Sequence, residues 1–152
     1  GISGFQSKFR SKICSTSIGG ESCLFIKPQT YMNKSGEAIA EIVNFYKIPL
    51  EKIVIISDDV DLPTGKVRFR DEGHNGLRSI IESLGSVNFQ RIRFGVGRPP
   101  DKNNLVGHVL GRWSESEKKI TRSAFNLALK DLVMFLETSR FENVSFSISK
   151  AE

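Results

Sequence analysis

Three carboxylates follow a short apolar run, at a place where a β-sheet could present them to a ligand. Asp58, Asp59 and Asp61 come after residues 53–56, which have the length and composition of a central strand. In open α/β sheets, ligands bind at the carboxyl ends of the strands. A carboxylate at such an end can orient a histidine, bind a metal ion or accept a phosphoryl group. The same aspartates could instead cap a turn, because Asp-Leu-Pro is favourable turn sequence.

Two asparagines stand at junctions between predicted elements. Asn75 lies in a Gly-His-Asn-Gly sequence at residues 73–76, ahead of a short predicted helix. Its amide could bind a substrate carbonyl or a water, and the glycines would let the backbone approach a ligand. Asn33 ends a Gln-Thr-Tyr-Met-Asn sequence at residues 29–33, between a predicted strand and a predicted helix. Either amide could also be a simple helix cap.

Basic side chains alternate with apolar ones along two predicted strands. This alternation puts the basic and the apolar residues on opposite faces. The cations continue into a proline-rich loop over residues 97–104. Such rows could bind the phosphates of an RNA backbone, or they could form a solvated sheet face. Aromatic residues suitable for stacking bases are not interleaved with these cations, which favours contacts to phosphates and shape over stacking on bases. The cations are Lys66, Arg68, Arg70, Arg91, Arg93, Arg98 and Lys102.

Composition narrows the classes of partner and cofactor. The net charge of +5 suits a polyanionic partner or plain solubility. Neither histidine has metal-ligand spacing and no nucleotide fingerprint is present, so no metal and no cofactor are expected. Cys14 and Cys23 indicate small core residues of a reducing compartment, and a cytoplasmic monomer is expected. No apolar run reaches the length of a membrane span.

The order of the predicted elements is typical of an α/β domain with a mixed sheet. Strands are predicted at residues 11–18 and 23–27 around Gly19 and Gly20, and at 53–56, 66–70 and 91–96. A short helix should end at Gly85, and Ser114 with Glu117 forms a capping box ahead of a long helix. We expect one domain over residues 1–152 with a frayed tail over 138–152. Two helices should bury apolar faces, one with Ile39, Ile42, Val43 and Tyr46, the other with Ile120, Ala124, Leu127, Leu132 and Phe135.

Five segments, in this order, resemble the bacterial-type peptidyl-tRNA hydrolase family. They are KPQTYMNKSG at 27–36, DDVDLPTG at 58–65, GHNGL at 73–77, RIRFGVGRP at 91–99 and VGHVLG at 106–111. Five ordered motifs over nearly the whole chain are far more specific than any one of them. The resemblance implies a single α/β domain with a twisted mixed sheet flanked by helices. It also implies metal-independent cleavage of the ester between a peptide and the tRNA 3′ end, which recycles tRNA from stalled translation.

The resemblance also implies roles for individual residues. Asn33 and Asn75 would position the substrate and the attacking water, and Tyr31 and Met32 would bind substrate, Met32 as part of a peptide groove. Asp58 would hydrogen-bond the catalytic histidine and keep its imidazole basic. The loop over residues 97–104 would be a mobile lid. The tRNA phosphates would be met by Lys66, Arg68, Arg93, Arg98 and Lys102.

Two departures from the family pattern lead to further expectations. The family begins with a strand, a Gly-Asn-Pro-Gly turn and a catalytic His-Asn, so we expect a segment carrying that histidine ahead of Gly1. Without it the chain should be inactive, because losing a His general base costs about 10²- to 10⁴-fold. The family has a longer glycine-rich loop before Gly73, so further residues are expected there. His74 is expected to be structural.

Two alternatives remain open at this point. The first is a non-catalytic RNA-binding member of the same fold, which would bind tRNA with steep salt dependence but leave the ester intact. The second is a magnesium-dependent phosphohydrolase or phosphoacceptor that uses Asp58 and Asp59 at the strand end.

Overall fold

The computed structural model describes residues 4–70, 77–138 and 145–147. Its backbone contacts cluster into two compact units, each made from two stretches of chain. Unit 1 comprises Gly1–Ile53 and Glu72–Phe89, and unit 2 comprises Val54–Asp71 and Gln90–Glu152. Both units combine a small sheet with helices, which confirms the predicted α/β class. The single domain stays a prediction.

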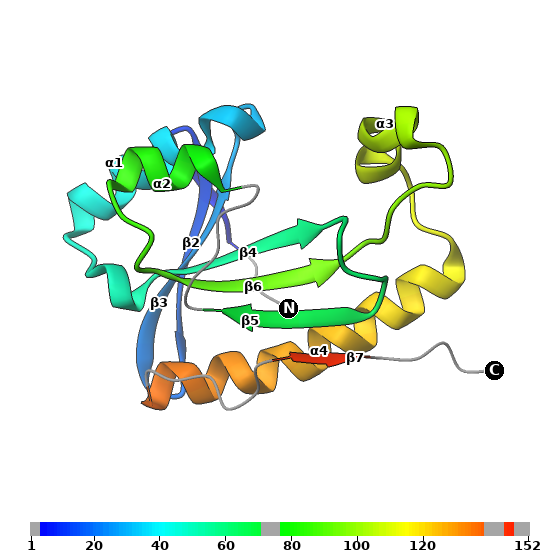
Figure 1. Cartoon of the computed structure of the whole chain (residues 1–152). Coiled ribbons are helices and arrows are strands. Elements are labelled where there is room, and N and C mark those ends of the chain that lie inside the picture. Colours follow the sequence, from blue (N-terminus) through cyan, green and yellow to red (C-terminus); the bar gives the residue numbers. More distant parts are fainter. Residues whose placement is uncertain (1–3, 71–76, 139–144, 148–152) are drawn as a thin grey trace. The chain divides into compact units, whose positions relative to one another are not determined.

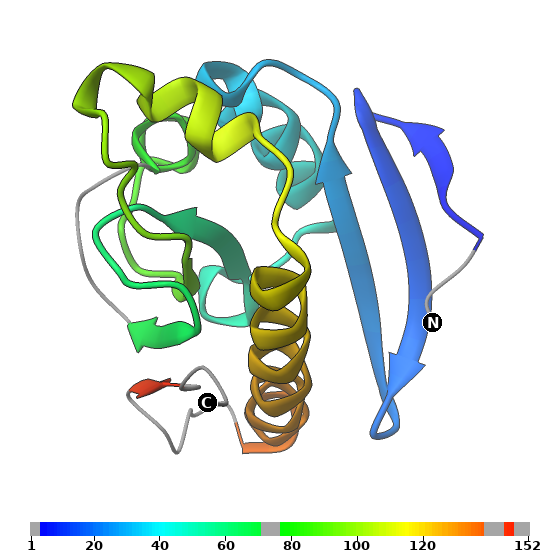
Figure 2. The ribbon, with the colours of Figure 1, turned by 90° about the vertical axis from the view of Figure 1, so that its right-hand side faces the viewer.

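The sheet of unit 1 is antiparallel, with strand order β1-β2-β3 (Figure 2, blue). Gly19 and Gly20 form the two-residue turn between β2 and β3 with φ of 59° and 85°. This is the backbone conformation of a tight hairpin, so the predicted hairpin is confirmed. A first strand that the sequence did not predict extends the sheet by one strand. The strands are β1 (Gln6–Lys8), β2 (Ser11–Ile18) and β3 (Glu21–Pro28).

The helices of unit 1 bury the apolar face that their periodicity predicted, with one exception. Ile39, Ile42 and Val43 are buried, whereas Tyr46, the last residue of α1, is 42% exposed. Gly85, with φ of 68°, ends the second helix as predicted. The helical elements are η1 (Met32–Lys34), α1 (Ser35–Tyr46), η2 (Leu50–Lys52) and α2 (Arg78–Leu84).

The sheet of unit 2 is mixed, as predicted, with strand order β4-β6-β5-β7 (Figure 1). β4 and β6 are parallel, and the other two pairs are antiparallel. The strands are β4 (Val54–Asp59), β5 (Lys66–Arg70), β6 (Gln90–Gly95) and β7 (Ser145–Ser147).

Two features of this sheet differ from the sequence predictions. β7 lies inside the tail that was predicted to be frayed, and it pairs with β5, which would otherwise leave backbone groups of its edge unpaired. Ile56 was predicted to lie in a strand covered on both faces but is 49% exposed. It belongs to β4, which lies at the edge of the sheet in the described part of the chain.

A long helix packs on the sheet of unit 2 and closes its core (Figure 1). Ser114 Oγ accepts a hydrogen bond from the Glu117 amide at 3.2 Å, and the Glu117 carboxylate accepts one from the Ser114 amide at 2.7 Å. The predicted capping box is therefore confirmed. Leu127, predicted to be buried, is 39% exposed. The core contains Val67, Phe69, Ile92, Phe94, Ala124, Ala128 and Leu132. The helical elements are η3 (Lys102–Asn104), α3 (Leu105–Leu110) and α4 (Glu115–Thr138).

None of the helices in the described ranges has the length and apolar character needed to cross a bilayer.

The contact between α1 and α2 gives a test of the fold. A Cβ on Gly36 would lie 1.9 Å from the Ser79 backbone oxygen. Alanine in a helix is normally favoured over glycine by about 1 kcal/mol, but here the overlap should dominate. We expect Gly36→Ala to lower the free energy of unfolding by about 1–3 kcal/mol in urea denaturation.

Gly107→Ala, in α3, is the matched control. Its Cβ would meet the end of the Asn104 side chain, which can rotate away. A Gly36→Ala protein as stable as the Gly107→Ala protein would contradict the close approach.

Candidate functional site

The turn after β4 is held by backbone hydrogen bonds to the segment that follows β6. We call residues 59–64 the acidic turn. The Asp59 carbonyl accepts from the Val96 amide at 3.1 Å, and the Leu62 carbonyl accepts from the Gly97 amide at 2.9 Å. Asp59 Oδ1 also accepts from the Asp61 amide at 2.8 Å, which closes the turn. The carboxyl ends of the two parallel strands are thus joined at the edge of the sheet where ligands bind in open α/β folds.

Gly95 has to be a glycine for this junction to form. A Cβ at this position would lie 2.0 Å from the Pro63 backbone oxygen. The acidic turn therefore lies directly against the end of β6.

An ion pair between Asp59 and Arg93 fixes the acidic turn to the sheet. Arg93 donates a hydrogen bond to Asp59 Oδ2 at 3.1 Å, and the two side chains are 11% and 14% exposed respectively. A pair withdrawn this far from water depends on both partners, because either charge alone would be costly. Sequence reasoning missed this pair. The parallel register of β4 and β6 brings the pair together. It places Ser57 opposite Arg93, and Asp59 lies on the same face as Ser57, two residues further along the strand.

The cations of β6 are not a solvated row. Arg91 is fully buried, and this burial together with the positive charge of Arg93 lowers the pKa of Arg91. Arg93 forms an ion pair with Asp59. Its contact with a tRNA phosphate stays a prediction. Lys66 and Arg68 are half-buried on β5, and Arg98 and Lys102 are exposed beyond β6. Arg68 lies opposite Arg93 in the register of β5 and β6.

Asp58 has a different environment from Asp59, although the two are adjacent. The register places Asp58 opposite Phe94, whose side chain belongs to the core on the α4 side of the sheet. Successive residues of a strand point to opposite faces, so Asp58 and Asp59 point away from each other. Asp58 is exposed and available to a partner. Among the residues that the structure describes, no group of three His, Cys, Asp or Glu side chains could hold a metal ion.

His108 connects α3 to the same junction. Its Nε2 lies 3.0 Å from the Val96 carbonyl oxygen and 2.9 Å from the Gly97 carbonyl oxygen. Both partners are acceptors, so Nε2 carries the proton and donates it. Nothing in the motif at residues 106–111 indicates these two distant carbonyl groups, so the sequence did not predict this contact.

A pocket of about 480 Å³ opens beside the acidic turn. Arg98 forms an ion pair with Asp61 across it, and both side chains are more than half exposed. A pair this exposed contributes at most about 1 kcal/mol and can open readily. The pocket is lined by Val60, Asp61, Leu62, Pro63, Thr64, Gly97 and Arg98.

The other predicted site residues belong to unit 1 or lie outside the description. Asn33 is exposed in η1, and Tyr31, just before η1, is 83% exposed. The Tyr31 carbonyl accepts from the Lys34 amide at 2.8 Å, which closes the turn around Asn33. Met32 lies in η1, but its side chain is outside the described part. His74 and Asn75 lie outside the described residues.

Comparison with known sequences gives one consistent family. The model of the family described as "Peptidyl-tRNA hydrolase" matches residues 1–151. A peptidyl-tRNA hydrolase of Caldanaerobacter subterraneus subsp. tengcongensis is 45% identical, over 90% of this chain and 76% of the relative. One from Bacillus pumilus is 43% identical, over 82% of this chain and 69% of the relative.

Solved structures give the same family. A crystal structure of peptidyl-tRNA hydrolase from Acinetobacter baumannii superposes with a TM-score of 0.79 at 33% identity, covering 88% of this chain and 70% of that one. A complex of a peptidyl-tRNA hydrolase with N-propanol gives a TM-score of 0.81, also at 33% identity, covering 90% and 71%.

The two adjacent aspartates should respond differently to the same substitution. Asp59→Asn removes the charge that Arg93 needs and should lower the free energy of unfolding by about 3 kcal/mol. Asp58→Asn alters an exposed carboxylate and should change it by no more than about 0.5 kcal/mol. Chemical denaturation of both proteins checks this difference. Equal losses would mean that the buried ion pair does not hold the acidic turn.

Proposed function

The chain belongs to the peptidyl-tRNA hydrolase family, and we propose that it hydrolyses the ester between peptide and tRNA in peptidyl-tRNA, recycling tRNA from stalled translation. The observation that carries this proposal is the family match over residues 1–151, which includes all five motifs. The geometry supports it, because Asp58 is exposed at the carboxyl end of β4, where such a fold binds its ligand.

In the proposed reaction, Asp58 accepts a hydrogen bond from the catalytic histidine and stabilises its charged form. The histidine takes a proton from a water, and that water attacks the ester carbonyl. The histidine then returns the proton to the leaving 3′ oxygen as the C–O bond breaks, which releases the peptide acid and the tRNA 3′ hydroxyl. Asn33 and Asn75 position the water and the substrate, and Tyr31 and Met32 bind the peptide. No metal or cofactor takes part in these steps.

Nε2 of His108 is not available as the base, because it donates to the Val96 and Gly97 carbonyl groups and has no lone pair to offer a water. His74 is kept as a structural residue in the proposal.

The tRNA is proposed to bind through phosphate contacts. Lys66, Arg68, Arg98 and Lys102 are the candidates with exposed or half-buried side chains, and Arg93 is included from the family pattern. Such contacts read backbone and shape, so the preference among tRNAs should be small. We propose that the protein acts in the cytoplasm, where tRNA is used. We also propose that it acts as a monomer.

The two alternatives are less well supported. A magnesium-dependent phosphohydrolase would need Asp58 and Asp59 to share one ion, but these side chains point to opposite faces of β4 and Asp59 binds Arg93. A non-catalytic RNA-binding protein is not favoured by relatives that are named as hydrolases. The first experiment below separates it from the enzyme.

The first experiment measures cleavage of peptidyl-tRNA by this chain and by the full product of its gene, with and without a chelator. We expect the full product to cleave with no loss in the chelator. Asp58→Asn in the full product should lower kcat by about 10²-fold or more.

Two outcomes would change this proposal. Cleavage that stops in the chelator would favour metal chemistry. Binding of tRNA without cleavage by either protein would favour the RNA-binding alternative.

The second experiment tests the phosphate contacts through the salt dependence of tRNA binding. Each phosphate contact contributes about 0.7–0.9 to the slope of log K against log salt concentration. Lys102→Gln should therefore reduce the slope by about one contact and weaken different tRNAs alike. Lys52→Gln, an exposed lysine of η2 outside the proposed contacts, is the control. Equal slopes for the two variants would remove Lys102 from the interface.

A further inference from the structure

We propose that Arg10 is a positioning residue for the substrate-binding segment 29–37, which it contacts at both ends. This inference rests on the proposed function, because it assigns Arg10 an effect on Asn33 and its neighbours. Arg10 belongs to none of the five family motifs. It lies in the turn between β1 and β2, and all the residues of the argument belong to unit 1.

The first contact is at the start of the segment. The Arg10 backbone carbonyl accepts a hydrogen bond from the Gln29 amide at 2.8 Å. Gln29 follows the last residue of β3 and opens the Gln-Thr-Tyr-Met-Asn motif. The chain therefore leaves the sheet at a point that the Arg10 turn defines.

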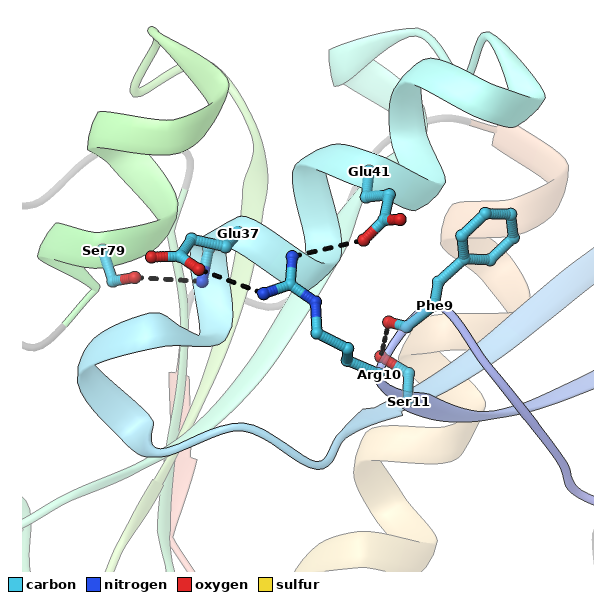
Figure 3. Close-up of polar contacts among 7 residues, drawn as sticks. Phe9, Arg10, Ser11, Glu37, Glu41 and Ser79 are labelled. Atoms are coloured by element: carbon cyan, nitrogen blue, oxygen red, sulfur yellow. Dashed lines mark hydrogen bonds and ion pairs between the residues drawn. The ribbon is translucent and has the colours of Figure 1, made fainter.

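The second contact is at the end of the segment. The Arg10 guanidinium donates to Glu37 at 3.1 Å and to Glu41 at 3.2 Å, both on α1 (Figure 3). These hydrogen bonds, Glu37 first, raise the pKa of Arg10 and keep it charged. The fork of the guanidinium reaches two carboxylates one helical turn apart, which an ammonium group cannot do in the same way.

The backbone of the Arg10 turn is itself held in an unusual conformation. Phe9 and Arg10 have φ of 52° and 53°, the left-handed region that favours glycine or asparagine in a two-residue hairpin turn. Such a conformation persists when its surroundings determine it. Here the Phe9 ring packs 5.0 Å from Phe45 on α1, and the buried Ser11 hydroxyl donates to the Phe9 carbonyl at 3.1 Å. These packing contacts hold the turn to α1 together with the two ion pairs, whose side chains are about half exposed.

A third anchor secures the same end of the segment from α2. The Gly36 amide donates to Ser79 Oγ at 3.0 Å (Figure 3). Asn33 lies between these anchors, in the short turn η1 that the Lys34 amide closes onto the Tyr31 carbonyl. An exposed amide in so short a turn has few contacts of its own to fix its direction, so the anchors at both ends of the segment set it. Arg10 supplies one anchor at each end.

The test separates positioning from a general loss of stability. Arg10→Asn keeps a residue that tolerates the left-handed region but removes both ion pairs. Glu37→Gln combined with Glu41→Gln removes the same ion pairs while leaving the Arg10 turn unchanged. Arg10→Lys keeps the charge and one possible contact. Arg78→Asn is the matched control, because it removes another exposed ion pair of unit 1, that with Glu82, and leaves both Arg10 ion pairs in place.

Two quantities are measured for each protein. The first is the affinity for a peptidyl-tRNA analogue with an amide in place of the ester, relative to the affinity for the same tRNA without peptide. The second is the hydrogen exchange of the amides of residues 29–34. Arg10→Asn and the double variant should each weaken analogue binding by about tenfold, leave binding of tRNA alone unchanged, and speed the exchange. Arg10→Lys should restore part of the affinity, and Arg78→Asn should match the wild type.

The inference fails if Arg10→Asn leaves the affinity ratio and the exchange unchanged, or if it weakens both ligands equally. It also fails if Arg78→Asn has the same effects. If the wild type itself binds the analogue no better than free tRNA, the proposed function fails. In that case the exchange of residues 29–34 alone decides whether Arg10 holds the segment.

Discussion

The parallel pairing of β4 with β6, locked by the Asp59–Arg93 ion pair, is the constraint on which the candidate site of unit 2 depends. Parallel pairing brings the carboxyl ends of both strands to one edge, and the ion pair holds the acidic turn there. The two charges are almost out of water, so separating them would leave each without compensation. The acidic turn, the segment 95–98 and α3 through His108 therefore form one connected structure.

This constraint gives two adjacent carboxylates, Asp58 and Asp59, different environments. Neighbouring side chains of a strand point to opposite faces, so one aspartate can form a structural ion pair while the next remains available to a partner. Asp59 satisfies a buried guanidinium and closes a turn, and Asp58 remains exposed. A general-base histidine needs a carboxylate partner whose charge is not already neutralised. The burial of Asp59 thus indicates a structural role, and the exposure of Asp58 supports the catalytic role proposed for it.

Features that depend on a few consecutive residues could be predicted from the sequence. The Gly19-Gly20 hairpin, the Gly85 helix end and the Ser114–Glu117 capping box are all present, because their partners lie within a few positions. Predictions that depended on distant partners were less successful. Ile56 and Leu127 follow the apolar pattern of their elements but are exposed, and the pattern cannot show what lies opposite them. β7 was missed for the same reason, since only the free edge of β5 makes residues 145–147 a strand.

The candidate site shows the same limit more sharply. Composition marked Arg93 as one member of a basic row, but its partner is 34 positions earlier in the chain. Nothing in the sequence indicated that His108 binds two carbonyl groups, because these partners lie 11 and 12 residues away. Arg10 has no motif at all, and its carboxylate partners lie 27 and 31 positions further on. A local sequence motif can identify residues proposed to contact the substrate, because the motif consists of neighbouring residues. Residues proposed to position them are identified by contacts between distant parts of the chain, and only the structure shows those contacts.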